Sequence, residues 1–248
     1  MMIKRKEIFY LSILFIAISS AFQSCKLDVK KVQDRLEKVE ESASTQQTED
    51  SIIPKGTNAF KKLLPYRKEG WTELTIKDGF AVDIRYATKN NFTNSQIYDC
   101  PRCLLRDDVA ASLNLLNQHL IQKYNLRIKL FDCYRPKAYQ QRLWDKVPDP
   151  SYVTPPAKGS MHTRGMAVDL TLVDSLGNEL DMGTEYDFFG KEAHYDYTGH
   201  DAKIIERRQF LRKKMKEYGF EGIRTEWWHF SFGSGGYDLA TFTWTCER

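Results

Sequence analysis

The stretch "SMHTRGMAVDLTL" (Ser160–Leu172) places a histidine, a glycine and an aspartate just before and within a strand pattern. Side chains in a strand point alternately to opposite faces, so the apolar face that includes Val168 is predicted to pack in the core. Asp169 then lies on the other face, toward solvent or into a cleft. Gly165 permits a sharp turn that would bring His162 over Asp169. Alone, such a pair is more often an ordinary hydrogen bond than half of a metal site.

Outside this stretch, strand and helix patterns are mixed, without the regular alternation of a doubly wound sheet. The patterns predict strands over 80–86, 127–134, 167–173 and 225–232, and helices over 106–124, 136–147 and 202–219. This order favours an α+β fold with a mostly antiparallel central sheet flanked by helices. We expect residues 59–248 to form a single domain.

The N-terminal residues are predicted to lie outside that domain. Residues 1–24 have a basic start and an apolar run shorter than the roughly 20 residues that cross a membrane, which is typical of a secretory signal. Its ending, "FQSC", resembles a bacterial lipoprotein signal, with cleavage before Cys25 and lipid on its sulfur. Residues 25–58 would then be a flexible tether. We expect export to the periplasmic face of a membrane, contacted only through the lipid; the alternative is a plain secreted protein.

Charge and cysteine content narrow the class of protein. The formal net charge of +4 over 248 residues is too weak to indicate nucleic-acid binding. Besides the lipidation candidate, the cysteines are Cys100, Cys103, Cys133 and Cys246. In an exported protein they are expected to form structural disulfides, and the sequence leaves their pairing open. A redox motif or half a zinc knuckle at "CPRC" is less favoured, because no second C-x-x-C follows.

The stretch "TEWWHF" (Thr225–Phe230) supplies two more polar side chains. Glu226 and His229 are three residues apart, so a bend or bulge is needed to bring them to one side of a strand. His162, Asp169 and His229 would give two imidazoles and a carboxylate, with a fourth position open to water, as in catalytic zinc sites. We therefore predict one Zn²⁺ per chain. The alternative is a core strand in which the tryptophans pack and the polar residues are incidental.

Two further side chains would complete a hydrolytic site. Glu226 is not needed for coordination, so it could take a proton from the attacking water and deliver it to a leaving amine. Arg135 follows a predicted strand in "DCYRP" and precedes a proline, which favours an extended backbone. Its permanent charge could stabilise the oxyanion of a tetrahedral intermediate. The alternative for this arginine is a surface salt bridge.

These motifs resemble those of the zinc D-alanyl-D-alanine dipeptidases of the vancomycin-resistance type, which belong to the D,D-peptidases with a hedgehog-like zinc fold. Five blocks carry the resemblance, in order "DIRYATKNNFTN", "DCYRP", "SMHTRGMAVDLTL", "LDMGTEYDFF" and "EWWHF", over about 71–232. The resemblance implies that residues 59–248 are a zinc D,D-dipeptidase domain. It also implies a small D-amino-acid dipeptide as substrate, with hydrolysis of D-Ala-D-Ala to two D-alanines.

The same resemblance assigns roles to individual residues. It implies zinc ligation by His162, Asp169 and His229, general base catalysis by Glu226, and transition-state stabilisation by Arg135. It further implies that Asp187 receives the ammonium group of the substrate, and that Ser160 contacts substrate. A carboxylate suits the first of these tasks, since a free ammonium group in a confined site needs a charged partner.

Three functional interpretations remain open at this point. Because the resistance enzymes act in the cytoplasm, an exported relative is expected to salvage wall-derived D-Ala-D-Ala instead. A D,D-carboxypeptidase that trims peptidoglycan stem peptides is the second interpretation. A non-enzymatic wall-binding lipoprotein is the third, and the intact Glu226 argues against it. The oligomeric state is left open.

Overall fold

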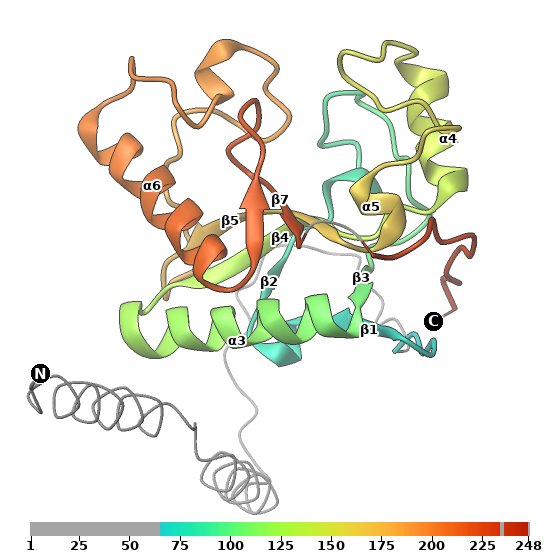
Figure 1. Ribbon diagram of the computed structural model, residues 1–248, viewed down its shortest axis with the longest axis horizontal. Coiled ribbons are helices and arrows are strands. Elements are labelled where there is room, and N and C mark those ends of the chain that lie inside the picture. Colours follow the sequence, from blue (N-terminus) through green and yellow to red (C-terminus); the bar gives the residue numbers. More distant parts are fainter. Residues whose placement is uncertain (1–64, 234–235, 248) are drawn as a thin grey trace, which may run out of the picture. The chain divides into compact units, whose positions relative to one another are not determined.

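The computed structural model describes residues 65–233 and 236–247, which fall within the structural unit Ala59–Arg248 (Figure 1). The predicted signal (1–24), the lipidation site Cys25 and the tether (25–58) all lie outside the described residues. The main sheet has the strand order β2-β4-β5-β7-β6. Its strands are β2 (Ala81–Val82), β4 (Arg127–Asp132), β5 (Ala167–Val173), β7 (His229–Phe232) and β6 (Phe220–Gly222). The β2–β4 pairing is parallel and the others are antiparallel, so the predicted α+β fold with a mostly antiparallel sheet is confirmed.

A smaller sheet and the helices surround this central sheet. β1 (Trp71–Leu74) and β3 (Cys103–Arg106) form a separate antiparallel pair. The helices are α3 (Asp107–Tyr124), α4 (Lys137–Lys146), α5 (Met161–Arg164) and α6 (Ala202–Glu217), with 3-10 turns η1 (Ile76–Asp78), η2 (Arg85–Ala87) and η3 (Lys191–Ala193). Figure 1 shows α3 running below the sheet, and α6 and α4 above it at opposite ends. Within residues 65–233 and 236–247, no helix is long and apolar enough to cross a membrane.

The three predicted helices are confirmed to within two residues at each end. The apolar side of α3 explains why its pattern was readable, since Val109, Leu113, Leu116 and Leu120 are all fully buried. Asn125 ends this helix in the left-handed conformation, at φ 55°. Asparagine tolerates that conformation better than most residues.

Two predicted strands are only partly confirmed. The segment 80–86 forms β2 over Ala81–Val82 and then turns into η2, where Ala87 N donates to Ile84 O at 3.0 Å. This turn directs Tyr86 into the core, where it packs against Tyr98 and Tyr186. In the segment 225–232, only β7 is a strand. The three residues before it form a turn, and that turn is the bend that the sequence required.

All seven residues of β5 are buried, because the strand lies between β4 and β7 and is covered on both faces. Of the two surroundings expected for Asp169, solvent or a cleft, the structure shows the second, since Asp169 is only 3 % exposed. The loop that carries Tyr186 covers it, and Tyr186 Oη donates to Asp169 Oδ2 at 3.0 Å. The polar face of β5 thus looks into an enclosed site.

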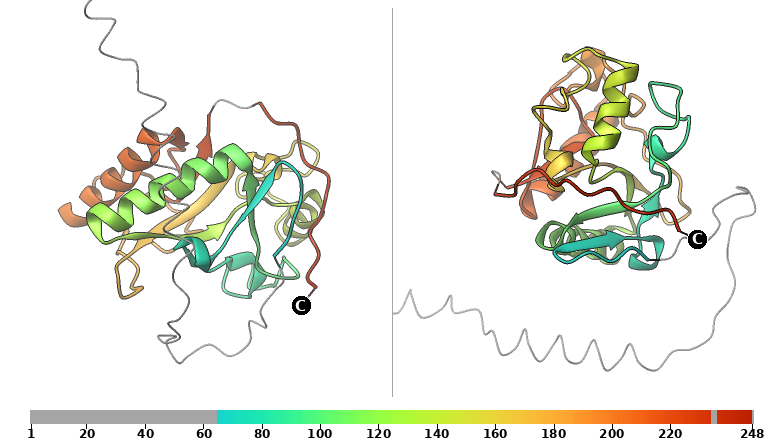
Figure 2. Two further views of the ribbon diagram at one scale, coloured as in Figure 1. Left: turned by 90° about the horizontal axis from the view of Figure 1, so that it is seen from below. Right: turned by 90° about the vertical axis from the view of Figure 1, so that its right-hand side faces the viewer.

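Two disulfides link distant parts of the chain, Cys100 to Cys246 and Cys103 to Cys133. The two cysteines of "CPRC" do not pair with each other, so the structure favours the structural role over a redox motif. The C-terminal segment runs along the side of the molecule that carries α5 (Figure 2). Ala240 N donates to Thr163 O at 3.0 Å, which ties this segment to α5.

Candidate metal centre and active site

Three of the predicted site residues converge on one point. His162 lies in α5, Asp169 in β5 and His229 at the start of β7, where it pairs directly with Asp169. His162 Nε2 is 3.1 Å from His229 Nδ1 and 3.3 Å from Asp169 Oδ1, and the latter two atoms are 2.9 Å apart. Both His162 and Asp169 are buried, and the side chain of His229 is 12 % exposed. The sequence prediction of a three-residue metal site therefore agrees with the geometry.

The hydrogen bonds behind these atoms leave all three free to act as metal ligands. His162 Nδ1 lies 2.7 Å from Cys133 O, which only accepts, so Nδ1 carries the hydrogen and Nε2 keeps a lone pair. His229 Nε2 lies 3.1 Å from Ser231 Oγ, and donation to this hydroxyl would leave the lone pair of Nδ1 for a metal. Three such electron pairs repel one another unless a cation lies among them.

The spacing and the donor types fit zinc. Bonds of about 2.0–2.2 Å in a tetrahedral site place neighbouring ligand atoms roughly 3.3 Å apart, close to the separations between these three atoms. Two imidazoles and one carboxylate also match the ligand set of catalytic zinc sites, in which a fourth position stays open. The site can therefore hold a metal ion while leaving room for water or a substrate oxygen.

Local sequence explains how His162 is aimed at this point. Ser160 caps the single turn of α5, since its Oγ accepts from Thr163 N at 3.3 Å. Gly165 ends the turn with φ 73°, and its carbonyl accepts from Arg106 N at 3.1 Å. A Cβ at Gly165 would lie 2.3 Å from the ring of Trp71. The predicted turn at Gly165 is thus present, and only glycine fits there.

Electrostatics favour an ionised carboxylate in the centre. Burial opposes ionisation of Asp169, but His162 and His229 hold the pKa of its carboxyl well below its usual range. Burial likewise opposes charging of His162, whereas Asp169 and Asp132 together raise its pKa. The cluster therefore already favours positive charge beside Asp169, which is the role that a metal ion would fill.

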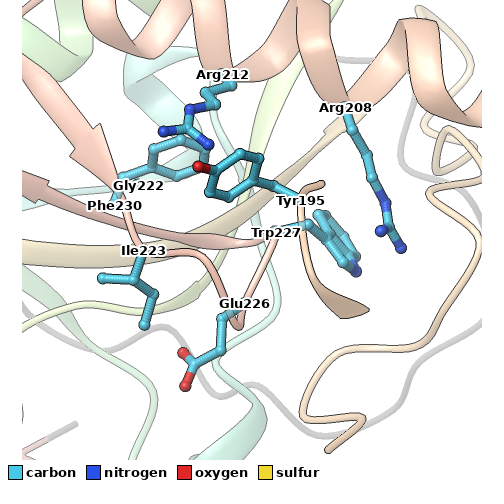
Figure 3. Close-up of a pocket in the computed structure, with 8 residues that line it drawn as sticks. All are labelled: Tyr195, Arg208, Arg212, Gly222, Ile223, Glu226, Trp227 and Phe230. Atoms are coloured by element: carbon cyan, nitrogen blue, oxygen red, sulfur yellow. The ribbon is translucent and has the colours of Figure 1, made fainter. Parts of the chain in front are cut away.

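Glu226 projects from the turn that precedes β7. His229 N approaches Glu226 O at 3.4 Å in this turn, and Glu226 Oε2 lies 4.0 Å from His229 Nδ1. Burial raises the pKa of the Glu226 carboxyl, and Asp169 adds to the effect while His229 opposes it. Figure 3 shows the Glu226 carboxylate pointing away from Trp227, at the edge of a pocket behind the turn. A carboxylate near the ligands but outside the ligand set, with a raised pKa, is suited to proton transfer.

Arg135 is buried and held in place, so the alternative of a surface salt bridge is wrong. Its Nε and Nη2 donate to Asp132 Oδ2 at 3.1 and 2.7 Å, and its Nη1 donates to Gln140 Oε1 at 3.2 Å. Its guanidinium also lies 5.0 Å from the ring centroid of Tyr86. Each terminal nitrogen uses one of its two hydrogens in these bonds, so a second remains on each for a substrate oxygen.

Asp187 and Arg135 both contact Tyr86. Tyr86 Oη donates to Asp187 Oδ2 at 3.0 Å, and the ring of Tyr86 packs against the Arg135 guanidinium. Asp187 has φ 61°, an uncommon conformation for a residue with a side chain and one often found at functional sites. Burial raises the pKa of its carboxyl well above the usual range, and the negative charge of Asp169 adds to this.

The D-Ala-D-Ala dipeptidase family of M15 peptidases matches residues 73–246 of this chain. The chain belongs to this family. A D-alanyl-D-alanine dipeptidase of Escherichia coli (strain K12) is 36% identical over 166 residues, which cover 66% of this chain and 86% of that protein. A D-alanyl-D-alanine dipeptidase of Enterococcus faecium is 31% identical over 188 residues, covering 65% of this chain and 90% of the other. The family resemblance drawn from the motifs is therefore confirmed.

Solved structures of D,D-peptidases also align with this M15 chain. The vancomycin-resistance D,D-dipeptidase VanXYg, in complex with a D-Ala-D-Ala phosphinate analog, has 23% identity and a TM-score of 0.34, covering 65% of this chain and 66% of that one. A VanB-type D,D-pentapeptidase VanY with Zn(II) has 16% identity and a TM-score of 0.35, covering 53% and 74%. At these scores the likeness adds nothing to the site geometry of this M15 member.

Sequence reasoning missed several residues that support the site of this M15 chain. They are Asp132, which holds Arg135; Tyr86, which bonds Asp187; Tyr186, which holds Asp169; Ser231, beside His229; and Cys133, whose carbonyl orients His162. Tyr86, Asp132, Cys133 and Tyr186 lie inside blocks that carried the family resemblance, so a signal existed for these four, whereas Ser231 lies just beyond the last block. What each residue does still depends on contacts between distant segments, which spacing along the chain does not reveal.

Proposed function

We propose that this chain is a zinc-dependent dipeptidase that hydrolyses D-Ala-D-Ala to two D-alanines. The observation that carries the proposal is the convergence of His162, Asp169 and His229, with the non-ligand carboxylate of Glu226 beside them. Family membership supplies the substrate class. Two acidic side chains then have different tasks. Glu226 transfers the proton, and Asp187 recognises the free amine of the substrate.

Zinc bound by these three ligands would polarise the scissile carbonyl and make the attacking water more acidic. Glu226 takes a proton from that water and passes it to the leaving amine, a role that its raised pKa favours. Arg135, fixed by Asp132, donates its remaining N–H groups to the carbonyl oxygen as negative charge develops there. Because Asp132 holds the guanidinium before substrate arrives, little reorganisation is needed during the reaction.

Asp187 binds the ammonium group of the dipeptide, and Tyr86 orients the Asp187 carboxylate by its hydrogen bond. A carboxylate that is costly to ionise in its buried position gains most when a cation binds to it. Ser160 caps α5 and so positions His162. A contact between Ser160 and substrate is a separate proposal, compatible with its partial exposure.

We further propose that the protein is exported and held by lipid at Cys25 on the periplasmic face of a bacterial membrane, where it salvages D-Ala-D-Ala released from the wall. The two disulfides support an oxidising compartment. Mass spectrometry of the mature N-terminus tests the anchor, since an unmodified terminus beyond Cys25 contradicts it. Clear glycopeptide resistance from the full chain, with its signal intact, would contradict the salvage role.

The deciding assay is release of D-alanine from D-Ala-D-Ala by residues 59–248, with and without a chelator. We expect release that the chelator stops and added Zn²⁺ restores. An N-acylated D-Ala-D-Ala peptide separates this activity from that of a carboxypeptidase, because acylation removes the ammonium group that Asp187 would bind. Faster hydrolysis of the acylated peptide would favour the stem-trimming alternative, and no hydrolysis of either would favour the wall-binding one.

The first mutational prediction concerns Glu226. Replacing Glu226 with Gln removes the proton acceptor but keeps the size of the side chain, so we expect kcat to fall about 10²–10⁴-fold. Zinc content, measured by atomic absorption, should stay at one ion per chain, because Glu226 is not a ligand. Unchanged turnover would remove Glu226 from the mechanism, and loss of zinc would make it a ligand instead.

A further inference from the structure

The Cys103–Cys133 disulfide lies directly behind the candidate metal centre. Cys133 O accepts the hydrogen bond from His162 Nδ1 at 2.7 Å, so this backbone carbonyl decides which way the imidazole faces. Cys133 and Cys103 are 0 % and 1 % exposed. Second partners of metal-ligating histidines fix both the tautomer and the orientation of the ring. Here that partner belongs to a residue that is covalently attached to another part of the fold.

The segment around Cys133 holds His162 at more than one point. Arg135 N donates to His162 O at 3.1 Å, and Cys133 N donates to the Asp132 side chain at 2.9 Å. The same segment therefore carries the carbonyl that orients His162 and the arginine proposed to stabilise the oxyanion. A displacement of this short segment would move a metal ligand and Arg135 together.

This segment has few regular backbone bonds of its own. β4 ends at Asp132 and α4 begins at Lys137, so the residues between them belong to neither element. Tyr134 N donates to Leu104 O at 2.9 Å, which attaches the segment to β3. The disulfide joins the segment to the same strand one residue earlier, at Cys103. One hydrogen bond and one covalent bond thus fix the segment against β3.

We propose that Cys133 is a positioning residue for the metal centre, and that the centre reaches its full metal affinity only when the Cys103–Cys133 disulfide has formed. The inference rests on the proposed function and adds a regulation to it. The bond forms by exchange with a disulfide oxidant: the two thiols become one disulfide, and the oxidant takes up two electrons and two protons to become a dithiol. The reduced chain binds zinc weakly, and the oxidised chain binds it tightly.

This coupling suits an enzyme that is made in one compartment and works in another. Thiols stay reduced in the cytoplasm and are oxidised after export. A chain whose metal centre is incomplete before export would spare D-Ala-D-Ala inside the cell, where it is needed for wall synthesis. The device lies in the chain itself and needs no separate inhibitor.

The test compares two variants of residues 59–248, each of which lacks one disulfide. In Cys103→Ala/Cys133→Ala we expect the Kd for zinc, measured by competition with a chromogenic chelator, to rise about 10–100-fold. Cys100→Ala/Cys246→Ala is the matched control and should keep the wild-type Kd, because neither of its cysteines bonds a site residue. The proton resonance of His162 Nδ1–H should shift or broaden in the first variant alone.

Equal zinc Kd values in the wild-type protein and both variants would overturn the proposal, as would an equal rise in both variants. If the alanine pair does not fold, Cys103→Val/Cys133→Ala restores much of the lost volume and is judged by the same measurements. The zinc readout does not depend on hydrolysis. A wild-type chain that binds zinc without cleaving D-Ala-D-Ala would refute the proposed function and leave this inference standing.

Discussion

Asp187 combines a buried, costly charge with the proposed role of binding the ammonium group of the substrate. Its carboxyl is buried beside the negative Asp169, and both effects raise its pKa well above the usual range. At neutral pH the folded protein must therefore either protonate this group or bear its buried charge. We expect Asp187→Asn to raise the free energy of unfolding at neutral pH, while kcat/KM for D-Ala-D-Ala falls by at least 10-fold (about 1.4 kcal/mol) through a higher KM.

The stability difference between Asp187→Asn and the wild-type protein should depend on pH. A carboxyl with a raised folded-state pKa contributes stability that is complete below its unfolded pKa, near 4, and is lost as pH rises through its folded pKa. The advantage of Asp187→Asn should therefore be absent at acid pH and appear above the folded pKa of Asp187. Urea denaturation of both proteins across this range measures it. A mutant that is less stable than the wild-type protein at every pH would contradict the burial argument.

For single residues, the sequence predicted which side chains form the candidate metal site, but not which neighbours bury and orient them. His162, Asp169 and His229 could be predicted because their types and motifs specify a known kind of zinc site. The burial of Asp169 could not, because it depends on Tyr186, which arrives from a separate loop. Arg135 was predicted from "DCYRP" as a site residue, but its fixed position depends on Asp132 and Gln140, and no spacing rule pointed to them.

At the scale of elements, the single turn of α5 sets the position of His162, and Gly165 ends that turn. An alanine at Gly165 would adopt φ 73° and bring its Cβ to 2.3 Å from Trp71, a buried ring packed against Tyr134 and Phe242. The conformation costs roughly 1–2 kcal/mol and the overpacking roughly 1–3 kcal/mol. We expect Gly165→Ala to lose about 3 kcal/mol of unfolding free energy and to bind zinc more weakly.

Gly177 offers the matched control. It has φ 88°, but a Cβ there would meet nothing within 4 Å. Gly177→Ala should therefore lose only the roughly 1–2 kcal/mol of the left-handed conformation and keep its zinc affinity. Urea denaturation and chelator competition on both variants give the comparison. Equal losses would show that the contact with Trp71 is relieved at little cost.

The long helices could be predicted from the sequence, whereas the ends of two strands could not. The apolar side of α3 repeats over several turns, so one exception does not hide its period. The segments 80–86 and 225–232 are short, and each combines a short strand with a turn that carries a candidate site residue, Tyr86 in η2 and Glu226 before β7. A strand pattern continues through such a turn because the same aromatic residues pack well in either conformation.

Contacts between residues far apart in the sequence hold the C-terminal segment against the rest of the domain. The C-terminal segment contacts α5 through Ala240. It also contacts the loop after β4, where Tyr134 Oη donates to Phe242 O at 2.6 Å. Four cysteines allow three pairings, and spacing along the chain does not choose among them. The pairing depends on this return of the C-terminus, which brings Cys246 to Cys100. Composition predicted the disulfides, but only the three-dimensional path decides their partners.

Loss of the Cys100–Cys246 disulfide should cost more stability, whereas loss of the Cys103–Cys133 disulfide should cost more metal affinity. Cys100–Cys246 joins residues 146 positions apart, and Cys103–Cys133 joins residues 30 apart. The longer loop restricts the unfolded chain more, so its removal should cost about 5 kcal/mol of unfolding free energy, against about 3.6 kcal/mol for the shorter loop. Urea denaturation of the two alanine-pair variants, both with a chelator present, measures this difference without the contribution of the metal.

Metal affinity should follow the reverse order, because it depends on the folded state and on the contact between Cys133 O and His162. The variant that is more stable without metal should thus be the one that binds zinc more weakly. Adding zinc should then raise the unfolding midpoint of Cys100→Ala/Cys246→Ala more than that of Cys103→Ala/Cys133→Ala, since a ligand stabilises in proportion to the logarithm of its concentration over Kd. The same gain in both variants would mean that the Cys103–Cys133 disulfide has no specific effect on the metal centre.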